Sequence, residues 1–531
     1  MQSFHRYSPW LALPIGAALS LAFAPFNLWP LAIVCPAFLF LSWQDASPKR
    51  AAKLGFLFTA GTFLAGTYWL YHSIYVIGQA PLVIAIFLML ALVCIMGGYT
   101  ALLAYAQARW FPKNGNLRFL VALPAAWLLL EWLRGWLFSG FPWLAIGYAS
   151  MDTPLAAFAP IVGVYGVGWL LAVMGGAVAA LALPSSVKSV HPELVEGLLQ
   201  VGQNENGTLR QIQGERNRVL IPCAAFLLPW LIAYPLWNRD WTTPTEAPIT
   251  VAIVQGAVPQ EMKWTPEQHA ATLKLYHDLT VPHWGAQLIV WPESALPDWA
   301  ESLTDYFSNV WQEASVHRSN LLTGVQHYDV KADKAYNSVL ALSDNVQWYS
   351  KNHLVPFGEY FPVPGFIRNW MRMMSLPHSD FSSGGDNQPA LAAAGQKIGV
   401  TICYEDAYGS TQLYVLKEAT LLVNVTNDAW FGDSTARHQH LQISRMRALE
   451  AGRPLLRAAN DGISGIIDSH GKLVSQLPSF KSDVLTGTVQ PRTGLTPYAR
   501  VGNWLIISLC VLLLAATIAL GSRQSANKLG S

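Results

Sequence analysis

Three polar residues that could carry out nucleophilic catalysis stand at the ends of apolar, β-rich segments. Glu293 follows the run Leu-Ile-Val-Trp-Pro, Lys351 follows Val-Gln-Trp-Tyr-Ser, and Cys403 follows Lys-Ile-Gly-Val-Thr-Ile. A buried strand that ends in one polar residue is a rigid mount for a catalytic group. Each residue alone is more typical of a turn, a surface or a small buried side chain, so the prediction rests on the three together.

The three side chains have complementary chemistry. A thiol with a pKa of about 8.5 is a weak nucleophile until a base removes its proton or a cation stabilises the thiolate. We therefore predict Cys403 as the nucleophile, Glu293 as the general base and later acid, and Lys351 as the cation near the developing oxyanion. The backbone N–H of Tyr404, next to the cysteine, is a second candidate donor to that oxyanion.

The segments around these residues predict a layered α/β domain within residues 238–500. Short strand-like runs alternate there with amphipathic stretches, which is typical of sheets covered by helices. The predicted strands are 249–255, 288–291, 321–326, 336–342, 397–403, 421–426, 455–459 and 463–468. The predicted helices are 266–281 and 435–451, and Asn-Asp-Gly at 460–462 predicts a hairpin turn.

The rest of the chain has the composition of a membrane protein. Of its 531 residues 52% are hydrophobic and only 12% are charged, about half the usual charged fraction. A helix needs roughly 20 mostly apolar residues to span a bilayer. The eight stretches that qualify are 10–24, 28–43, 52–77, 81–110, 119–138, 155–183, 219–237 and 503–520. We therefore predict seven spans in 1–237, interrupted by a polar cytoplasmic linker at about 185–218, and an eighth span in 501–531.

The distribution of basic residues predicts the orientation of these spans. Lys and Arg precede the first span and follow the second, fourth, sixth and eighth, whereas the loops after the first and third have none. By the positive-inside rule both termini are cytoplasmic, so 238–500 lies on the periplasmic side. Within the fifth span, Glu131 and Arg134 are three residues apart and are expected to pair. The formal net charge of +2 gives no indication of nucleic-acid binding.

The blocks WPES, KNHLVPFGEYFP and ICYED resemble, in this order, the three signature blocks of the carbon-nitrogen hydrolase (nitrilase) superfamily. The resemblance implies a Glu-Lys-Cys triad on an αββα sandwich. A sandwich with eight spans resembles the membrane branch of that superfamily, the apolipoprotein N-acyltransferases, over nearly the whole chain except the insert at 185–218. Further matching blocks are QGAVPQEMKW, YNSV, NDAWFGDSTARHQH, RMRALEAGRPLLRAANDGISGIID, TGLTPYAR and SGFPWL.

The resemblance also implies residues around the triad. Glu359 and Glu405 resemble carboxylates of the family that hold the lysine and the glutamate of the triad in place. Trp264 and Asn337 fall on family positions near the substrate, although Trp264 is equally typical of a packing aromatic.

The implied reaction is a ping-pong acyl transfer in the inner membrane of a Gram-negative-type bacterium. A phospholipid would donate an acyl chain to the cysteine as a thioester, and the free α-amino group of the diacylglyceryl-cysteine of an apolipoprotein would accept it. A membrane-tethered amidase or nitrilase that hydrolyses small amides has the same triad and remains an alternative. A transporter or receptor is disfavoured, because Glu131 is almost the only deep ionisable residue in the spans.

Two further segments bear on these predictions. His438 and His440 suggest a metal pair, but residues two apart on a helix do not share a face, so no metal or organic cofactor is expected. The segment 357–386 predicts a membrane-facing lid beside the triad lysine, with Trp370 and Met371 as typical contacts for a bilayer and for acyl chains. A packed surface loop is the alternative for that segment.

Overall fold

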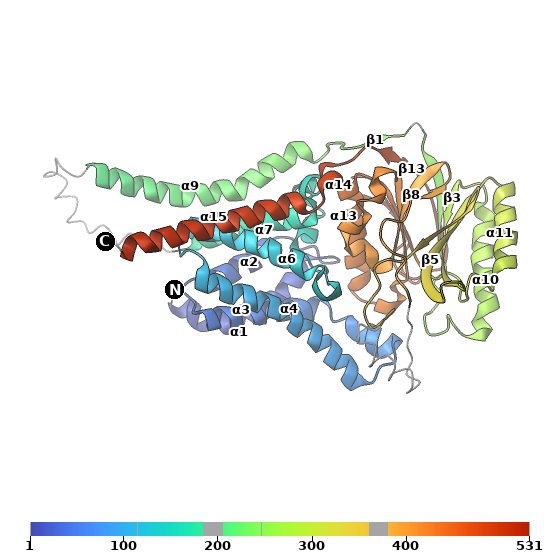
Figure 1. Cartoon of the computed structure of the whole chain (residues 1–531), viewed down its shortest axis with the longest axis horizontal. Helices are drawn as coiled ribbons and strands as arrows, with labels where there is room; N and C mark the ends of the chain where they lie inside the picture. Colours follow the sequence, from blue (N-terminus) through green and yellow to red (C-terminus); the bar gives the residue numbers. More distant parts are fainter. Residues whose placement is uncertain (1, 114, 184–204, 246, 361–380, 530–531) are drawn as a thin grey trace.

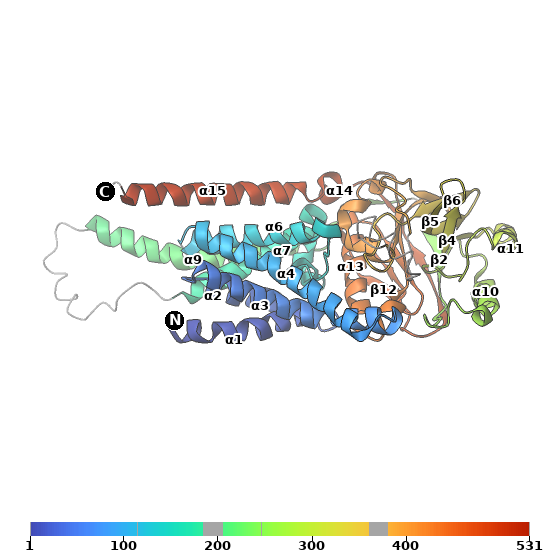
Figure 2. The ribbon, with the colours of Figure 1, turned by 60° about the horizontal axis from the view of Figure 1, so that its bottom comes forward.

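A computed structural model of the chain has two parts, a long bundle of helices and a β-sandwich at one end of it (Figure 1). The structure describes residues 2–113, 115–183, 205–245, 247–360 and 381–529. The start of helix α1 and the end of helix α15 both lie at the end of the bundle away from the sandwich (Figure 2).

The bundle is built from long helices that are mostly apolar. Their bounds are α1 Gln2–Leu19, α2 Leu31–Ser42, α3 Pro48–Gly66, α4 Leu82–Trp110, α6 Leu123–Arg134, α7 Ala159–Ala182, α9 Glu205–Leu236 and α15 Trp504–Leu529. Five stretches are long and apolar enough to cross a membrane, namely Leu82–Trp110, Gly115–Arg134, Pro154–Ala182, Arg216–Leu236 and Trp504–Gly521. These five correspond to predicted spans four to eight.

The first three predicted spans differ from the helices that form. The apolar helices Ser8–Ala22 and Leu31–Ser42 are shorter than a full membrane crossing requires. The third prediction, 52–77, is divided, because α3 ends at Gly66 and a separate π-helical turn covers His72–Ile77. Between them the Trp69 ring lies 4.8 Å from the ring of Phe431 in the sandwich, so a tertiary contact accompanies the break. The count of eight spans is therefore not established by these helices.

Helix α9 begins inside the segment predicted as a polar linker. The linker was expected at about 185–218, yet the helix starts at Glu205. Helix propagation adds one hydrogen bond for each residue that it fixes, so an apolar helix can extend into a polar stretch that lacks apolar periodicity. Residues 184–204 lie outside the described residues.

The sandwich consists of two six-stranded sheets. The first has the order β13-β2-β3-β4-β5-β6, with bounds Asp483–Val489, Ile249–Gln255, Leu288–Val290, Asn320–Asp329, Lys334–Leu342 and Val346–Ser350. The second has the order β12-β11-β10-β9-β8-β7, with bounds Leu473–Gln476, Gly465–Ile467, Leu455–Ala459, Leu421–Thr426, Gln396–Ile402 and Leu391–Ala393. A separate pair, β1 Thr243–Pro244 and β14 Arg492–Thr493, joins the two ends of the domain.

Helices cover the outer face of each sheet and complete four layers. Helix α13, Ala436–Ala451, lies between the second sheet and the bundle, whereas α10, Pro266–Thr280, and α11, Thr304–Val316, cover the first sheet at the far end of the molecule (Figures 1 and 2). The predicted αββα sandwich is therefore confirmed. The predicted hairpin is also confirmed, because β10 and β11 pair antiparallel around residues 460–462.

Apart from the short separate pair β1 and β14, the strands that the sequence did not predict stand at the edges of the two large sheets. β7 and β12 end the second sheet, and β13 ends the first. β12 and β13 alternate between exposed and partly buried residues, so neither has the continuous apolar run that marked the inner strands. Helix α11 was also not predicted.

Candidate active site

Glu293 lies three residues beyond β3 and is 7% exposed. Its carboxylate has a fixed partner on each oxygen. Oε1 accepts a hydrogen bond of 2.8 Å from Nδ2 of Asn337, and Oε2 accepts one of 2.9 Å from the backbone N–H of Asn427. Asn337 lies on β5 of the first sheet and Asn427 follows β9 of the second, so one residue from each sheet holds this carboxylate in one orientation, as a general base requires.

Lys351 follows β6 and is 1% exposed. Its Nζ donates a hydrogen bond of 2.8 Å to Oε1 of Glu359 and lies 3.7 Å from Oε1 of Glu293. Burial by itself lowers the pKa of Lys351, but the carboxylates of Glu359 and Glu293 outweigh burial and hold that pKa above its ordinary value. The lysine is thus a permanent cation within a buried site.

Asn337, on β5, connects the two carboxylates that face the lysine. Its Nδ2 donates to Oε1 of Glu293 at 2.8 Å and to Oε1 of Glu359 at 3.0 Å. The other oxygen of Glu359 accepts a hydrogen bond from the backbone N–H of Val355 at 2.8 Å. The side-chain amide of Asn337 therefore fixes the positions of the Glu293 and Glu359 carboxylates beside Lys351.

Cys403 follows β8 and is 9% exposed. Its backbone has a φ of 52°, in the left-handed region that side chains with a Cβ seldom adopt. Burial raises the pKa of the Cys403 thiol and the charge of Glu293 raises it further, whereas the charge of Lys351 lowers it. The second sheet thus brings a neutral thiol within electrostatic range of both charged groups from the first sheet.

Glu405 connects the segment that follows Lys351 to the end of β8, which precedes Cys403. Its Oε1 accepts hydrogen bonds from the backbone N–H of Asn352 at 2.6 Å and of His353 at 3.0 Å. Its Oε2 accepts from the Tyr349 hydroxyl at 3.0 Å and from the backbone N–H of Ile402 at 2.8 Å. These bonds tie it to the chain on either side of Lys351.

The two flanking carboxylates therefore act in different ways. Glu359 contacts the lysine directly and is linked to Glu293 through Asn337, as the resemblance implied. Glu405 instead accepts from the Tyr349 hydroxyl and from three backbone N–H groups, so it secures the chain beside Lys351 and Cys403.

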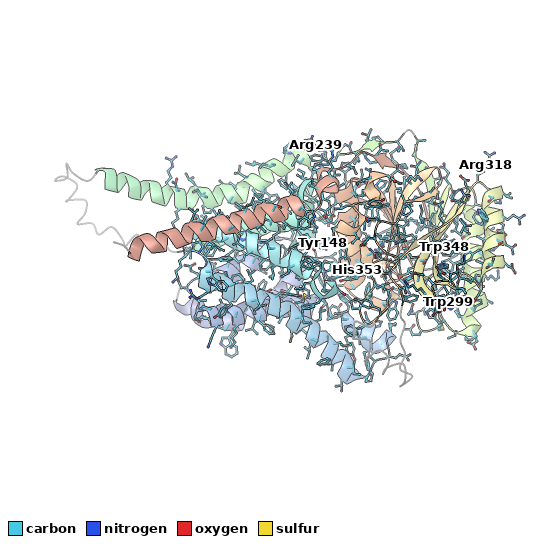
Figure 3. The ribbon with its side chains drawn as sticks, in the orientation of Figure 1. Tyr148, Arg239, Trp299, Arg318, Trp348 and His353 are labelled. Carbon is cyan, nitrogen blue, oxygen red and sulfur yellow. The ribbon has the colours of Figure 1, made fainter. Side chains whose placement is uncertain are left out.

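A loop from the bundle packs against two tyrosines that follow the cysteine. The Tyr404 ring stacks on Trp143 of that loop at 6.1 Å, and the Tyr408 hydroxyl donates to the carbonyl oxygen of Gly140 at 3.0 Å. The imidazole of His353 lies 3.6 Å from the Tyr408 ring, and burial lowers the pKa of His353 to about 4. Figure 3 shows His353 where the bundle meets the sandwich.

The structure does not bring every predicted site residue together. Trp264 is 45% exposed and, among the described residues, makes no hydrogen bond or ring contact with the triad. Trp370 and Met371 of the predicted lid lie outside the described residues. In the described ranges no group of three or more His, Cys, Asp or Glu residues is arranged to hold a metal ion.

Two buried groups beside the triad were not predicted. Lys263 is fully buried, its Nζ lies 3.5 Å from the backbone oxygen of Glu293, and burial lowers its pKa to about 8. His440, considered above only as a metal ligand, is fully buried and its Nε2 lies 3.2 Å from the carbonyl oxygen of Cys403. A lysine before a tryptophan was visible in the sequence, but nothing in the sequence indicated that either side chain would be buried at the site.

Two family models match successive parts of the chain. Residues 15–177 match the apolipoprotein N-acyltransferase N-terminal domain, and residues 250–498 match the carbon-nitrogen hydrolase domain. The first match covers most of the bundle and the second covers the sandwich with all three residues of the predicted triad.

Curated relatives match along almost the full length. An apolipoprotein N-acyltransferase of Methylococcus capsulatus is 39% identical over 521 residues, which cover 98% of this chain and 97% of the relative. One of Azotobacter vinelandii is 39% identical, with 95% and 93% covered, and one of Vibrio parahaemolyticus is 36% identical, with 94% and 95% covered.

Solved structures match about half of the chain at low similarity. The NitFhit protein of C. elegans is 17% identical with a TM-score of 0.37, covering 47% of this chain and 61% of the other. An amidase from Nesterenkonia is 17% identical with a TM-score of 0.37, covering 50% of this chain and 98% of the other.

Proposed function

The chain belongs to the apolipoprotein N-acyltransferase family, and from that membership we propose a ping-pong reaction centred on Cys403. The protein is an acyltransferase that acts in lipoprotein maturation, as its curated relatives are named. The observation that carries the proposed mechanism is the buried cluster in which Lys351 lies 3.7 Å from Glu293 and the charges of both shift the pKa of the Cys403 thiol.

In the first half-reaction the thiol takes an acyl chain from a phospholipid. Glu293 accepts the thiol proton as the sulfur attacks the ester carbonyl, and the ammonium of Lys351 with the N–H of Tyr404 stabilises the oxyanion that forms. The carbon–oxygen bond of the ester then breaks. The protonated Glu293 returns its proton to the departing alcohol, which leaves as lysophospholipid, and Cys403 holds the chain as a thioester.

In the second half-reaction the acceptor is the free α-amino group of an apolipoprotein whose N-terminal cysteine carries a diacylglyceryl group. Glu293 accepts a proton from the amine as the nitrogen attacks the thioester carbonyl. The carbon–sulfur bond breaks, the thiol of Cys403 is restored with that proton, and the product contains an amide. Both substrates are anchored by acyl chains, which is a reason for the sandwich to sit against a helical bundle.

We further propose eight membrane spans, with α1, α2 and α3 completing the five longer ones, in the inner membrane of a bacterium. Both termini would be cytoplasmic and the sandwich periplasmic. The distribution of Lys and Arg supports this orientation, as do the start of α1 and the end of α15, which share one end of the bundle. A reporter fused after Trp237 should be active only outside the cytoplasm and one after Arg523 only inside; the opposite pair of results would reverse the orientation.

The amidase alternative is less well supported. A hydrolase of small amides would need the sandwich and its triad, but the match to the family extends through the bundle as well. The discriminating experiment incubates purified protein with a fluorescent phospholipid, with and without a diacylated lipopeptide. We expect mass spectrometry to find the acyl chain on Cys403 without lipopeptide, and on the lipopeptide amine with it. Hydrolysis of small amides with no acylated Cys403 would favour the amidase.

A further inference from the structure

The carbonyl oxygen of Cys403 is held from the interior of the domain by two side chains. His440 Nε2 lies 3.2 Å from this oxygen, and Asn424 Nδ2 donates to it at 3.3 Å. In a trans peptide unit the C=O and the following N–H point in opposite directions. Fixing the Cys403 carbonyl therefore also fixes the direction of the Tyr404 N–H, which is the donor proposed above for the oxyanion.

His440 is fixed as a donor on both ring nitrogens. Nδ1 lies 3.0 Å from Oδ1 of Asp428, and Nε2 lies 3.0 Å from Oδ1 of Asp406. Ionised carboxylates only accept hydrogen bonds, so both nitrogens carry protons and the ring is an imidazolium. Burial and the nearby Arg457 lower the pKa of His440, but the two aspartates outweigh them and raise it to about 9.

Asn424 is oriented by the same arginine. Nη1 of Arg457 donates to Oδ1 of Asn424 at 2.9 Å, so the NH₂ group of the asparagine must face the other way. There it donates to Oγ1 of Thr401 at 3.1 Å and to the carbonyl oxygen of Cys403. Nη2 of Arg457 also donates to Oδ2 of Asp428 at 2.9 Å, which joins both donors into one network.

The network is buried, and its formal charges balance. All five of its side chains, His440, Asn424, Asp406, Asp428 and Arg457, are fully buried. An imidazolium and a guanidinium balance two carboxylates, so these five side chains together carry no net charge. Inside a protein such a chain of hydrogen bonds polarises its members, and a peptide unit whose oxygen accepts from a cation has a more acidic N–H.

We propose that His440 and Asn424 are positioning residues for the oxyanion site, because they hold the Cys403 carbonyl so that the Tyr404 N–H faces the reacting carbonyl. This inference rests on the proposed function, and it adds a reason for the left-handed φ of Cys403. The groups that face the imidazolium are Asp406, Asp428 and Arg457, together with the rings of Trp143 at 5.6 Å and Phe431 at 6.1 Å.

The test compares two reactions of the same thiol. Thioester formation from a fluorescent phospholipid passes through an oxyanion, whereas alkylation by iodoacetamide does not. In His440→Gln we expect the maximal rate of thioester formation to fall about 10- to 100-fold, toward the cost of losing one oxyanion donor. The KM for phospholipid and the rate of alkylation should stay near wild type.

The pH profile supplies a second readout. In the wild type the rate of thioester formation should fall as the pH rises through about 9, where the imidazolium loses its proton. In His440→Gln this alkaline decline should be absent. His438→Gln is the matched control, since it places the same substitution on the same helix outside the network, and it should behave as wild type. If His440→Gln does not fold, Asn424→Ala takes its place. It should likewise slow thioester formation and leave the rate of alkylation near wild type.

The outcomes distinguish failure of this inference from failure of the proposed function. An unchanged maximal rate in both variants would overturn the inference, and so would an equal loss of alkylation, which would mean that the thiol itself is displaced. If the wild type forms no thioester at Cys403, the proposed function fails and not only the role of the network.

Discussion

The helical bundle and the sandwich bury charged side chains in different ways. In the bundle, Glu131 and Arg134 stand three residues apart on α6 with 3.7 Å between the charged groups. Their other partners are backbone atoms of the following loop: Glu131 accepts from the N–H of Ile146, and Arg134 donates to the carbonyl oxygens of Phe141 and Trp143. In the sandwich, Lys351 meets carboxylates that come from separate segments of the first sheet and its loops.

We infer from this difference that the pair in the bundle has a structural role, whereas the charges of the sandwich belong to the candidate active site. The pair in the bundle fastens a loop, and Trp143 of that loop contacts the sandwich, because its Nε1 donates to Oε1 of Gln439 on α13 at 2.6 Å. The charges of Glu293 and Lys351 in the sandwich surround the Cys403 thiol and shift its pKa. We therefore expect substitutions in the sandwich cluster to stop the reaction and substitutions in the bundle pair to slow it.

The largest effect should come from the triad. Cys403→Ala should form no acyl-enzyme, and Glu293→Gln and Lys351→Ala should each lower the rate of thioester formation by more than about 10³-fold although the thiol remains. Because the three act as one unit, the Glu293→Gln/Lys351→Ala double variant should be little worse than either single variant. Mass spectrometry of Cys403 after rapid quenching measures these rates. N-acylation of lipopeptide by Cys403→Ala at a near wild-type rate would end the mechanism.

Asn337→Leu should have the next largest effect. It removes the amide that bonds both Glu293 and Glu359, and it leaves two buried carboxylates short of a donor. We expect a fall of about 10²-fold in the rate of thioester formation, roughly what 2.7 kcal/mol of lost transition-state stabilisation produces. Asn345→Leu, in the exposed turn of the same hairpin, is the control. Equal rates in the two variants would show that the spacing of the carboxylates does not depend on Asn337.

Arg134→Leu tests the bundle side of the comparison. Without the guanidinium, the carbonyl groups of Phe141 and Trp143 lose their donor, and the loop should loosen. We expect thioester formation to slow by about tenfold and the midpoint of thermal unfolding in detergent to fall, as is usual when a buried network is broken. Arg109→Leu, at the exposed end of α4, should change neither. A loss as complete as that of Cys403→Ala would break the comparison, because Arg134 would then belong to the chemistry.

The smallest effect concerns stability against pH. The pKa of His440 is raised from 6.5 to about 9 in the folded state, so its contribution to stability is full below pH 6.5 and is lost as the pH rises through about 9. The midpoint of thermal unfolding should therefore fall over this range more steeply in the wild type than in His440→Gln. If the midpoint of unfolding falls equally steeply with pH in both proteins, His440 is neutral at all these pH values and is not a buried cation.

Much of the candidate triad was predictable, because each of its members follows a β-rich segment. β2 and β9 have the bounds that the pattern predicted. In the structure Lys351 lies 3.7 Å from Glu293, and the charges of both shift the pKa of the Cys403 thiol. The edge strands β12 and β13 were missed because one face of each is exposed, and an exposed face interrupts the apolar run on which the prediction depends.

By itself the sequence determined the longer apolar helices, a layered α/β domain, the Glu131–Arg134 pair and the three polar strand ends. All of these follow from local periodicity and from spacing within one helix or strand. Only the tertiary structure decided that Glu405 secures the backbone beside Lys351, and that His440 contacts the carbonyl oxygen of Cys403. The physical reason is that a buried polar side chain takes whichever partner the packing brings within hydrogen-bond distance. Asp406, Asp428 and Arg457 approach His440 only when the second sheet and α13 close on one another.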